Sequence, residues 1–266
     1  MLWQKAGQVA LEANVPTLIM GDPGIGKTSY IYALGKAMGA HTEVVIAGLR
    51  EPSDFLGLPV QSPDGSVKMA PPAWAHRLAA TEKMGLLILD EITTAPPAVQ
   101  AALLRVVLER VVGELELPPH VRVVAIANAA DQVGGWELSL PLSNRFFHIS
   151  AEAPSVKEWT TGFQDGWKMP AKAPSLGKQT KNGASAKSLI CGFLTARPGL
   201  ILQVPKEDSK NRDAWPSPRS WDNASRLLDY GLGERSEVIH TLLAGTVGHG
   251  PGTEFMAWFK QLDLPD

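Results

Sequence analysis

The glycine-rich stretch at residues 21–28, GDPGIGKT, has the spacing of a phosphate-binding loop: glycine, four residues, glycine, lysine and threonine. Glycines allow consecutive backbone N–H groups to turn toward phosphate oxygens, and a following helix N-terminus adds partial positive charge. Lys27 is expected to reach the β- and γ-phosphates, and Thr28 offers a hydroxyl ligand for Mg²⁺. The stretch therefore predicts a site for ATP with Mg²⁺. The predicted nucleotide-binding residues are Asp22, Pro23, Gly24, Ile25, Gly26, Lys27, Thr28 and Ser29.

Two acidic residues follow a short apolar run at residues 86–89, LLIL. A buried strand there would deliver Asp90 and Glu91 to the carboxyl edge of a parallel sheet, where ligands bind in such folds. Asp90 is expected to hold the magnesium, while Glu91 orients and deprotonates an attacking water. Together with the loop, this pair predicts nucleotide hydrolysis.

Three further polar residues are candidates for the same chemistry. Asn128 ends the apolar run 121–127, so its amide would orient the water or touch the γ-phosphate; the alternative is a turn asparagine. Arg145 precedes a short run at 147–149 and would reach the γ-phosphate of a neighbouring subunit. Arg219 follows Pro-Ser-Pro in a second domain and would close over the phosphates. A surface ion pair is the alternative for Arg145.

Up to about residue 150, apolar runs alternate with helical patterns, which is typical of a parallel sheet flanked by helices. The runs are continuously apolar, as expected when helices cover both faces of each strand. A helix is expected over 29–38 after the loop, and another over 96–109 with Thr94 as its cap. The runs lie at 17–20, 44–47, 86–89 and 121–127.

Turn residues predict two hairpins within this α/β region. Pro-Asp-Gly lies inside residues 61–68, and Gly113-Glu114 lies inside 111–117. The first hairpin would be an insertion into the core. The second directly precedes the strand that begins at Val121.

The composition changes after residue 150. Residues 165–187 are rich in Lys, Gly, Pro and Ser and predict a mobile segment. Helical spacing of apolar residues follows, which predicts a small helical domain. We therefore expect an α/β nucleotide-binding core over 1–150 and a C-terminal helical lid over 151–266. The predicted lid helices lie at 220–230, 234–244 and 254–262.

Composition and net charge limit the classes of binding partner and the cellular compartment that we expect for the protein. A net charge of -2 provides no global basic field, so nucleic acid is not an expected partner. The single cysteine, Cys191, cannot form an internal disulfide and lacks the paired spacing of a zinc site. No stretch approaches the ~20 apolar residues of a membrane span, and the start lacks a signal-peptide run. The sequence predicts a cytoplasmic protein.

With these motifs in order, the chain resembles the MoxR family of AAA+ ATPases over nearly its whole length. Asn128 ends the segment that resembles sensor 1, Arg145 lies in the segment that resembles the arginine finger, and Arg219 lies in the segment that resembles sensor 2. The first hairpin falls where the helix-2 insert clade carries its insert. The matching segments read GDPGIGKTS (Walker A), LLILDE (Walker B), IAN, VQAALLRVVLERVV, LSNRF and PSPRSW.

The resemblance implies a five-stranded parallel core, an α-helical lid and ATP bound between them. It also implies a ring-shaped homo-oligomer, commonly a hexamer, and chaperone-like remodelling of a partner that often contains a von Willebrand factor A domain. The chain departs from the family at Ala129-Ala130, where many members have Asn-Pro, and in the polar segment 165–187.

Several other functions remain open on the residues alone. One is the ATPase subunit of a DNA translocation or restriction system, which predicts salt-dependent stimulation by DNA. Another is a monomeric small-molecule kinase, for which Glu91 and Arg145 would be superfluous. A nucleotide switch with slow turnover is a third. A GTPase is disfavoured because no Asn-Lys-x-Asp segment occurs.

Overall fold

The computed structural model describes residues 1–128, 135–167, 185–206 and 213–262. Most of the segment predicted to be mobile, residues 168–184, lies outside the described residues, as do Ala129 and Ala130. Within the described ranges, no helix combines the length and the apolar character needed to cross a membrane.

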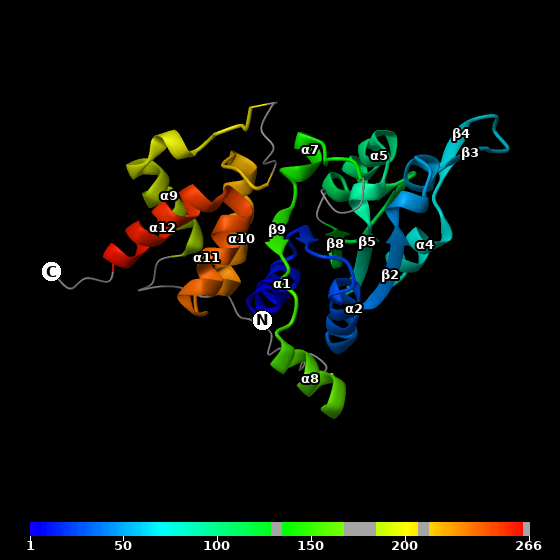
Figure 1. Ribbon diagram of the computed structural model, residues 1–266. Helices are drawn as coiled ribbons and strands as arrows, with labels where there is room; N and C mark the ends of the chain where they lie inside the picture. Colours follow the sequence, from blue (N-terminus) through cyan, green and yellow to red (C-terminus); the bar gives the residue numbers. More distant parts are fainter. Residues whose placement is uncertain (129–134, 168–184, 207–212, 263–266) are drawn as a thin grey trace. The chain divides into compact units, whose positions relative to one another are not determined.

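A five-stranded parallel sheet forms the centre of the α/β region, as predicted (Figure 1). Its strand order is β2-β5-β8-β1-β9, and the β2–β5 and β5–β8 pairs are parallel. The sheet therefore places Asp90 and Asn128 after neighbouring strands. The strands are β1 (Thr17–Met20), β2 (His41–Ile46), β5 (Gly85–Asp90), β8 (Val121–Ala127) and β9 (Phe147–Ser150).

The central strands are buried on both faces, but β2 is not. All four residues of the apolar run in β5, Leu86 to Leu89, have no exposed surface. In β2, Val44 is 40% exposed and Ile46 is 38% exposed. The prediction of full burial was wrong for this strand because β2 ends the strand order and pairs with β5 alone.

Helices alternate with the strands, as parallel connections require. Helix α2 (Lys27–Ala37) follows the glycine-rich loop and contacts β2 and β5, as does α4 (Ala73–Ala79). Helix α5 (Pro97–Leu108) contacts α3 (Ser53–Leu56). The prediction that Thr94 caps α5 was wrong: its N-cap is Pro96, and Pro97 begins the helix without needing an N–H donor.

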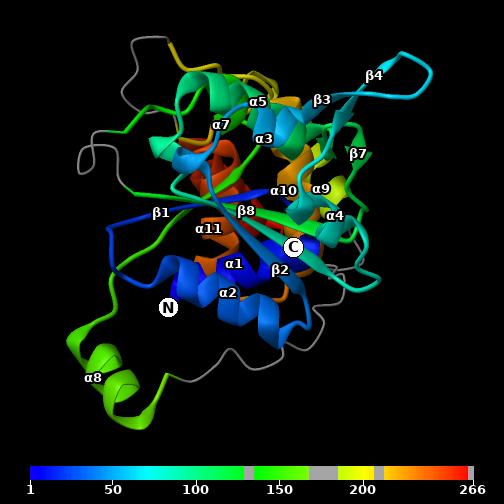
Figure 2. The same cartoon turned by 90° about the vertical axis from the view of Figure 1, so that its right-hand side faces the viewer.

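Both predicted hairpins are present. Strands β3 (Leu58–Gln61) and β4 (Val67–Ala70) pair antiparallel and extend away from the sheet in both views (Figure 2). Gly65 supplies the positive φ of 84° at their turn. The second hairpin joins β6 (Val111–Val112) to β7 (Leu115–Glu116). Assignment of the first hairpin to a helix-2 insert remains a prediction.

The described residues group into two compact units. The unit called here the P-loop unit comprises Leu18–Leu142 and Ser150–Ala173, and the helical unit comprises Met1–Thr17, Ser143–Ile149 and Pro174–Asp266. A division at residue 150 into nucleotide-binding core and lid remains a prediction. The remaining short elements are η1 (Ala47–Leu49), η2 (Ile92–Thr94), α7 (Leu140–Ser143), α8 (Val156–Asp165) and η3 (Pro198–Leu200).

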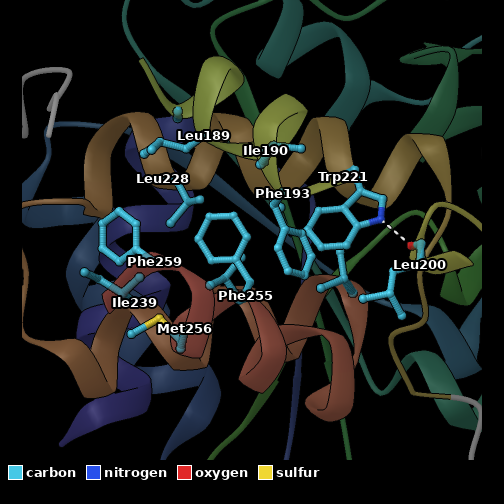
Figure 3. Close-up of a cluster of buried hydrophobic side chains, with 14 residues drawn as sticks. Leu189, Ile190, Phe193, Leu200, Trp221, Leu228, Ile239, Phe255, Met256 and Phe259 are labelled. Atoms are coloured by element: carbon cyan, nitrogen blue, oxygen red, sulfur yellow. Dashed lines mark hydrogen bonds between the residues drawn. The ribbon is translucent and has the colours of Figure 1, made fainter. Parts of the chain in front are cut away.

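An aromatic core holds the helical unit together (Figure 3). Phe193 packs edge-on against Phe255 with ring centroids 5.1 Å apart, and Trp221 donates its indole N–H to the Leu200 carbonyl at 2.9 Å. The three predicted lid helices are present as α10, α11 and α12, whereas α1 and α9 were not predicted. Helix α1 packs on α10 and α11. The helices are α1 (Leu2–Ala13), α9 (Ala186–Ala196), α10 (Pro218–Gly231), α11 (Ser236–Val247) and α12 (His249–Gln261).

Candidate active site

The glycine-rich loop connects β1 to α2 and exposes its backbone. Gly24 and Gly26 have φ values of 79° and 88°, in the left-handed region that side-chain-bearing residues rarely adopt. Gly26 is also the N-cap of α2 and has no side chain that could cap this helix end. The first N–H groups of α2 therefore face the exposed loop, the arrangement that binds phosphate at a helix N-terminus.

Gly21 is required at the start of the loop because another segment passes close by. A Cβ atom at this position would lie 2.4 Å from the backbone oxygen of Ala151. The same two segments are joined by a hydrogen bond from the Ala151 N–H to the Met20 carbonyl. The beginning of the loop is thus fixed by close backbone packing, whereas Asp22, Pro23 and Gly24 are exposed.

Lys27 lies beneath the loop and is only 5% exposed. Its ammonium group donates to the carbonyls of Gly21 and Asp22, both at 2.8 Å, and to Oδ1 of Asn128 at 2.9 Å. Burial lowers the pKa of Lys27, while the negative charges of Asp90 and Asp22 oppose that shift. The structure thereby brings together two predicted residues that lie 101 positions apart.

Thr28 and Asp90 form the second contact between predicted residues. The Thr28 hydroxyl donates to Oδ2 of Asp90 at 3.0 Å. One hydroxyl and one carboxylate beside a phosphate loop fit Mg²⁺, which keeps several waters and takes its remaining oxygens from phosphates. Within the described ranges, no group of three or more His, Cys, Asp or Glu side chains forms a protein-only metal cage. The donor set therefore suits a metal that arrives with a phosphate ligand.

Glu91 has an exposed side chain and a strained backbone. Its φ of 54° and ψ of 42° place a non-glycine residue in the left-handed region, which costs about 1–3 kcal/mol. The Thr94 N–H and hydroxyl both donate to the Glu91 carbonyl, at 3.0 and 2.8 Å, and the Glu91 N–H donates to Oδ1 of Asp90 at 3.0 Å. These bonds hold the left-handed conformation of Glu91 and engage the Asp90 carboxylate, whereas the Glu91 side chain is exposed.

Arg145 and Arg219 belong to the helical unit and lie near each other there. Ser217, the N-cap of α10, lies two positions before Arg219 and donates its hydroxyl to Oδ1 of Asn144, which directly precedes Arg145, at 3.0 Å. Partial burial lowers the pKa of Arg145, and the positive charge of Arg219 lowers it further. The two guanidinium groups are therefore close enough for their charges to interact.

Gln100 is a polar residue of this region that the sequence reasoning missed. It occupies the buried face of α5 together with Val99, Leu103 and Val106, where an amphipathic pattern calls for apolar side chains. The sequence signal for Gln100 was a polar residue at a position where the helical pattern expects an apolar one. A buried amide requires hydrogen-bond partners, so this pattern indicates a structural role.

Comparison with known proteins agrees with this geometry. The model of the family described as "ATPase family associated with various cellular activities (AAA)" matches residues 16–148. The chain is 28% identical over 151 residues to Protein MoxR of Methylorubrum extorquens and 30% identical over 148 residues to Protein MoxR of Paracoccus denitrificans. These matches cover 55% and 53% of this chain but only 43% and 42% of the two relatives.

A solved structure of a proposed ATPase from Cytophaga hutchinsonii has a similar fold. The two structures superpose with a TM-score of 0.56, over 91% of this chain and 79% of the other. Their sequences are 18% identical, so this likeness concerns the fold alone.

Proposed function

The chain belongs to the MoxR family of AAA+ ATPases, and on that premise we propose that it binds ATP with Mg²⁺ and hydrolyses it at Lys27, Asp90 and Glu91. The observation that carries the proposal is the pair of contacts from the loop to the strand ends, Lys27 with Asn128 and Thr28 with Asp90. A glycine turn with no role in binding would not need a buried lysine and a carboxylate at its base.

Nucleotide binding changes the partners of Lys27. Its present acceptors are neutral oxygens, and charged phosphate oxygens form stronger hydrogen bonds with an ammonium group. Lys27 therefore turns toward the β- and γ-phosphates and releases the Asn128 amide. The exposed loop backbone and the N-terminus of α2 hold the remaining phosphate oxygens, and the released amide orients the attacking water.

Hydrolysis of ATP needs a base that accepts a proton from the attacking water and a bridging oxygen that leaves the γ-phosphorus. Mg²⁺, held by Thr28 and Asp90, neutralises charge on the phosphate oxygens when it is bound. Glu91 accepts a proton from the water as the water oxygen bonds to the γ-phosphorus, and the bond from that phosphorus to the bridging oxygen breaks. We assign the base to Glu91 because its side chain is exposed, whereas both carboxylate oxygens of Asp90 already accept hydrogen bonds, from the Thr28 hydroxyl and the Glu91 N–H.

Arg145 and Arg219 are the residues of the helical unit that we include in the active site. We assign Arg145 to the γ-phosphate of a neighbouring subunit and Arg219 to the phosphates as well, because a guanidinium group stabilises the charge that develops in phosphoryl transfer. This assignment requires a ring homo-oligomer, for which a hexamer is the proposed form. Chaperone-like remodelling, a partner with a von Willebrand factor A domain and a cytoplasmic location are parts of the same proposal.

The test is Mg²⁺-dependent ATP hydrolysis per protomer, measured over a wide range of protein concentration for the wild type and Glu91→Gln. We expect specific activity to rise with concentration as subunits assemble. Glu91→Gln should keep its affinity for ATP and lose about 100-fold or more in kcat. Activity that is constant on dilution would contradict the shared site, and full activity of Glu91→Gln would contradict the base.

A further inference from the structure

The side chain of Gln100 is almost completely buried and uses both ends of its amide. It is 2% exposed. Nε2 donates to the Ala95 carbonyl at 3.1 Å and to the Glu137 carbonyl at 3.3 Å, and Oε1 accepts the Ser139 N–H at 3.2 Å. A glutamine amide has two N–H donors and one oxygen with two lone pairs. Gln100 therefore uses both donors and one of the two lone pairs. One side chain therefore satisfies three backbone groups.

These three backbone groups come from two segments far apart in the sequence. Ala95 directly follows η2, the turn that begins after Glu91. Glu137 and Ser139 belong to residues 135–139, which precede α7 and Arg145 in the chain. Gln100 thus joins the turn that carries the proposed base to the segment that leads toward the proposed arginine finger.

A direct backbone contact joins the same two segments. The Trp136 N–H donates to the Thr93 carbonyl at 2.6 Å. A Cβ atom on Gly135 would lie 2.7 Å from that same carbonyl oxygen, so the approach requires glycine at this position. The junction is therefore a close packing of two backbones with the Gln100 amide beside it.

The junction supports a strained residue. Glu91 keeps its left-handed backbone only while neighbouring contacts over-determine it. The η2 turn supplies these contacts through Thr94, and the turn is itself held at Thr93 by Trp136 and at Ala95 by Gln100. Loss of the Gln100 amide would remove the hydrogen bond that holds Ala95 at the end of the turn and would allow the Glu91 carboxylate to move.

We infer that Gln100 is a positioning residue for ATP hydrolysis: it fixes the Glu91 turn and residues 135–139 as one rigid junction. The inference rests on the proposed function, because it assigns Gln100 to the same site. Gln100 acts through the backbone around Glu91 and does not touch the phosphate loop. Its loss should therefore affect turnover and leave ATP binding intact.

The test compares Gln100→Leu with Val99→Ala in the full chain. Leucine keeps most of the side-chain volume and removes all three hydrogen bonds, whereas Val99→Ala removes packing from the adjacent buried position of α5, where Val99 is 2% exposed. For each variant we would measure kcat and KM, the Kd for a non-hydrolysable ATP analogue, and amide hydrogen exchange in residues 91–95 and 135–139.

For Gln100→Leu we expect kcat to fall about tenfold or more, because small displacements of a catalytic group are costly, with the analogue Kd within about threefold of wild type. Exchange should accelerate in both segments. Val99→Ala should change neither kcat nor exchange in 135–139 to a comparable degree. A Gln100→Leu enzyme with wild-type kcat, or one whose loss matches that of Val99→Ala, would overturn the inference.

The exchange measurement separates this inference from the proposed function. If the wild type binds ATP but does not hydrolyse it under any assembly condition, the proposed function fails. The junction is then judged by exchange alone: selective deprotection of both segments in Gln100→Leu supports it, and unchanged exchange overturns it.

Discussion

Lys27 of the P-loop unit and Arg145 of the helical unit differ in the charges that act on them. In the P-loop unit, Lys27 is buried among oxygen acceptors near Asp90, so cation and anion are balanced over short distances. In the helical unit, burial lowers the pKa of Arg145, and the positive charge of Arg219 lowers it further. In the proposed function, the first arrangement binds the phosphates and the metal, and the second contributes its arginines to the active site of a neighbouring subunit.

The largest expected effect tests the helical side of this comparison. Arg145→Ala should lower kcat about 1,000-fold, the range for an arginine that stabilises phosphoryl-transfer charge, while the Kd for ATP stays near that of wild type. Arg197→Ala is the matched control, because Arg197 is an exposed arginine of the same unit, paired with Glu254.

Kinetics and equilibrium binding of nucleotide would be measured on both arginine variants, with thermal melting to confirm folding. Loss of ATP affinity in Arg145→Ala would place this arginine with the binding groups and remove the contrast between the units. Equal losses in the two variants would show a general effect of surface charge.

The next effect tests the P-loop side. Lys27→Met keeps the aliphatic stem and removes the ammonium group that donates three hydrogen bonds. Because one hydrogen bond from a charged donor contributes about 1.5–3 kcal/mol, loss of a single bond from the ammonium group to a phosphate oxygen should raise the Kd for ATP about 10- to 100-fold. Titration with a fluorescent ATP analogue measures this change. Lys36→Ala, at the exposed end of the same helix, should bind as the wild type does, and unaltered binding by Lys27→Met would refute the phosphate-loop assignment.

The smallest effect concerns the stability of the helical unit. Burial lowers the pKa of His148, opposed by its bond to the Ser143 carbonyl and by Asp213. The unfolded chain therefore binds more protons than the folded chain just below pH 6.5, so this stabilisation is present above that pH and is lost as pH falls.

Denaturant unfolding of the wild type between pH 7 and pH 5 should show stability falling by at most about 1.4 kcal/mol per pH unit from this group. His148→Gln keeps a side-chain donor and removes the titration, so its slope should be shallower. An unchanged slope would show that other groups cause the acid sensitivity.

Local signals were sufficient for the elements that carry the site. Glycines at positions of positive φ, an apolar strand before them and a helical pattern after them predicted β1, the loop and α2 to within two residues. The apolar run before Asp90 and Asn128 likewise predicted β5 and β8. Both hairpins followed from turn residues. These features depend on backbone preferences and on burial of a short segment, which neighbouring residues determine.

Contacts between segments that are distant in the sequence could not be predicted from local patterns. Nothing local indicates that β2 ends the strand order, so its exposed Val44 and Ile46 were expected to be buried. Helix α1 lacked any recognised signal of its packing on α10 and α11. Gln100 was treated as part of an amphipathic helix because its three partners lie on backbone segments whose proximity depends on the folded chain.

The sequence by itself determined the family and predicted the chemistry, through a phosphate loop, two acids after a buried strand and two arginines outside the loop. Only the tertiary structure decided which residues meet: Lys27 with Asn128, and Thr28 with Asp90. The physical reason is that residue type and local spacing set what a group can do. The packing of strands and helices distant in the chain sets which partners it reaches.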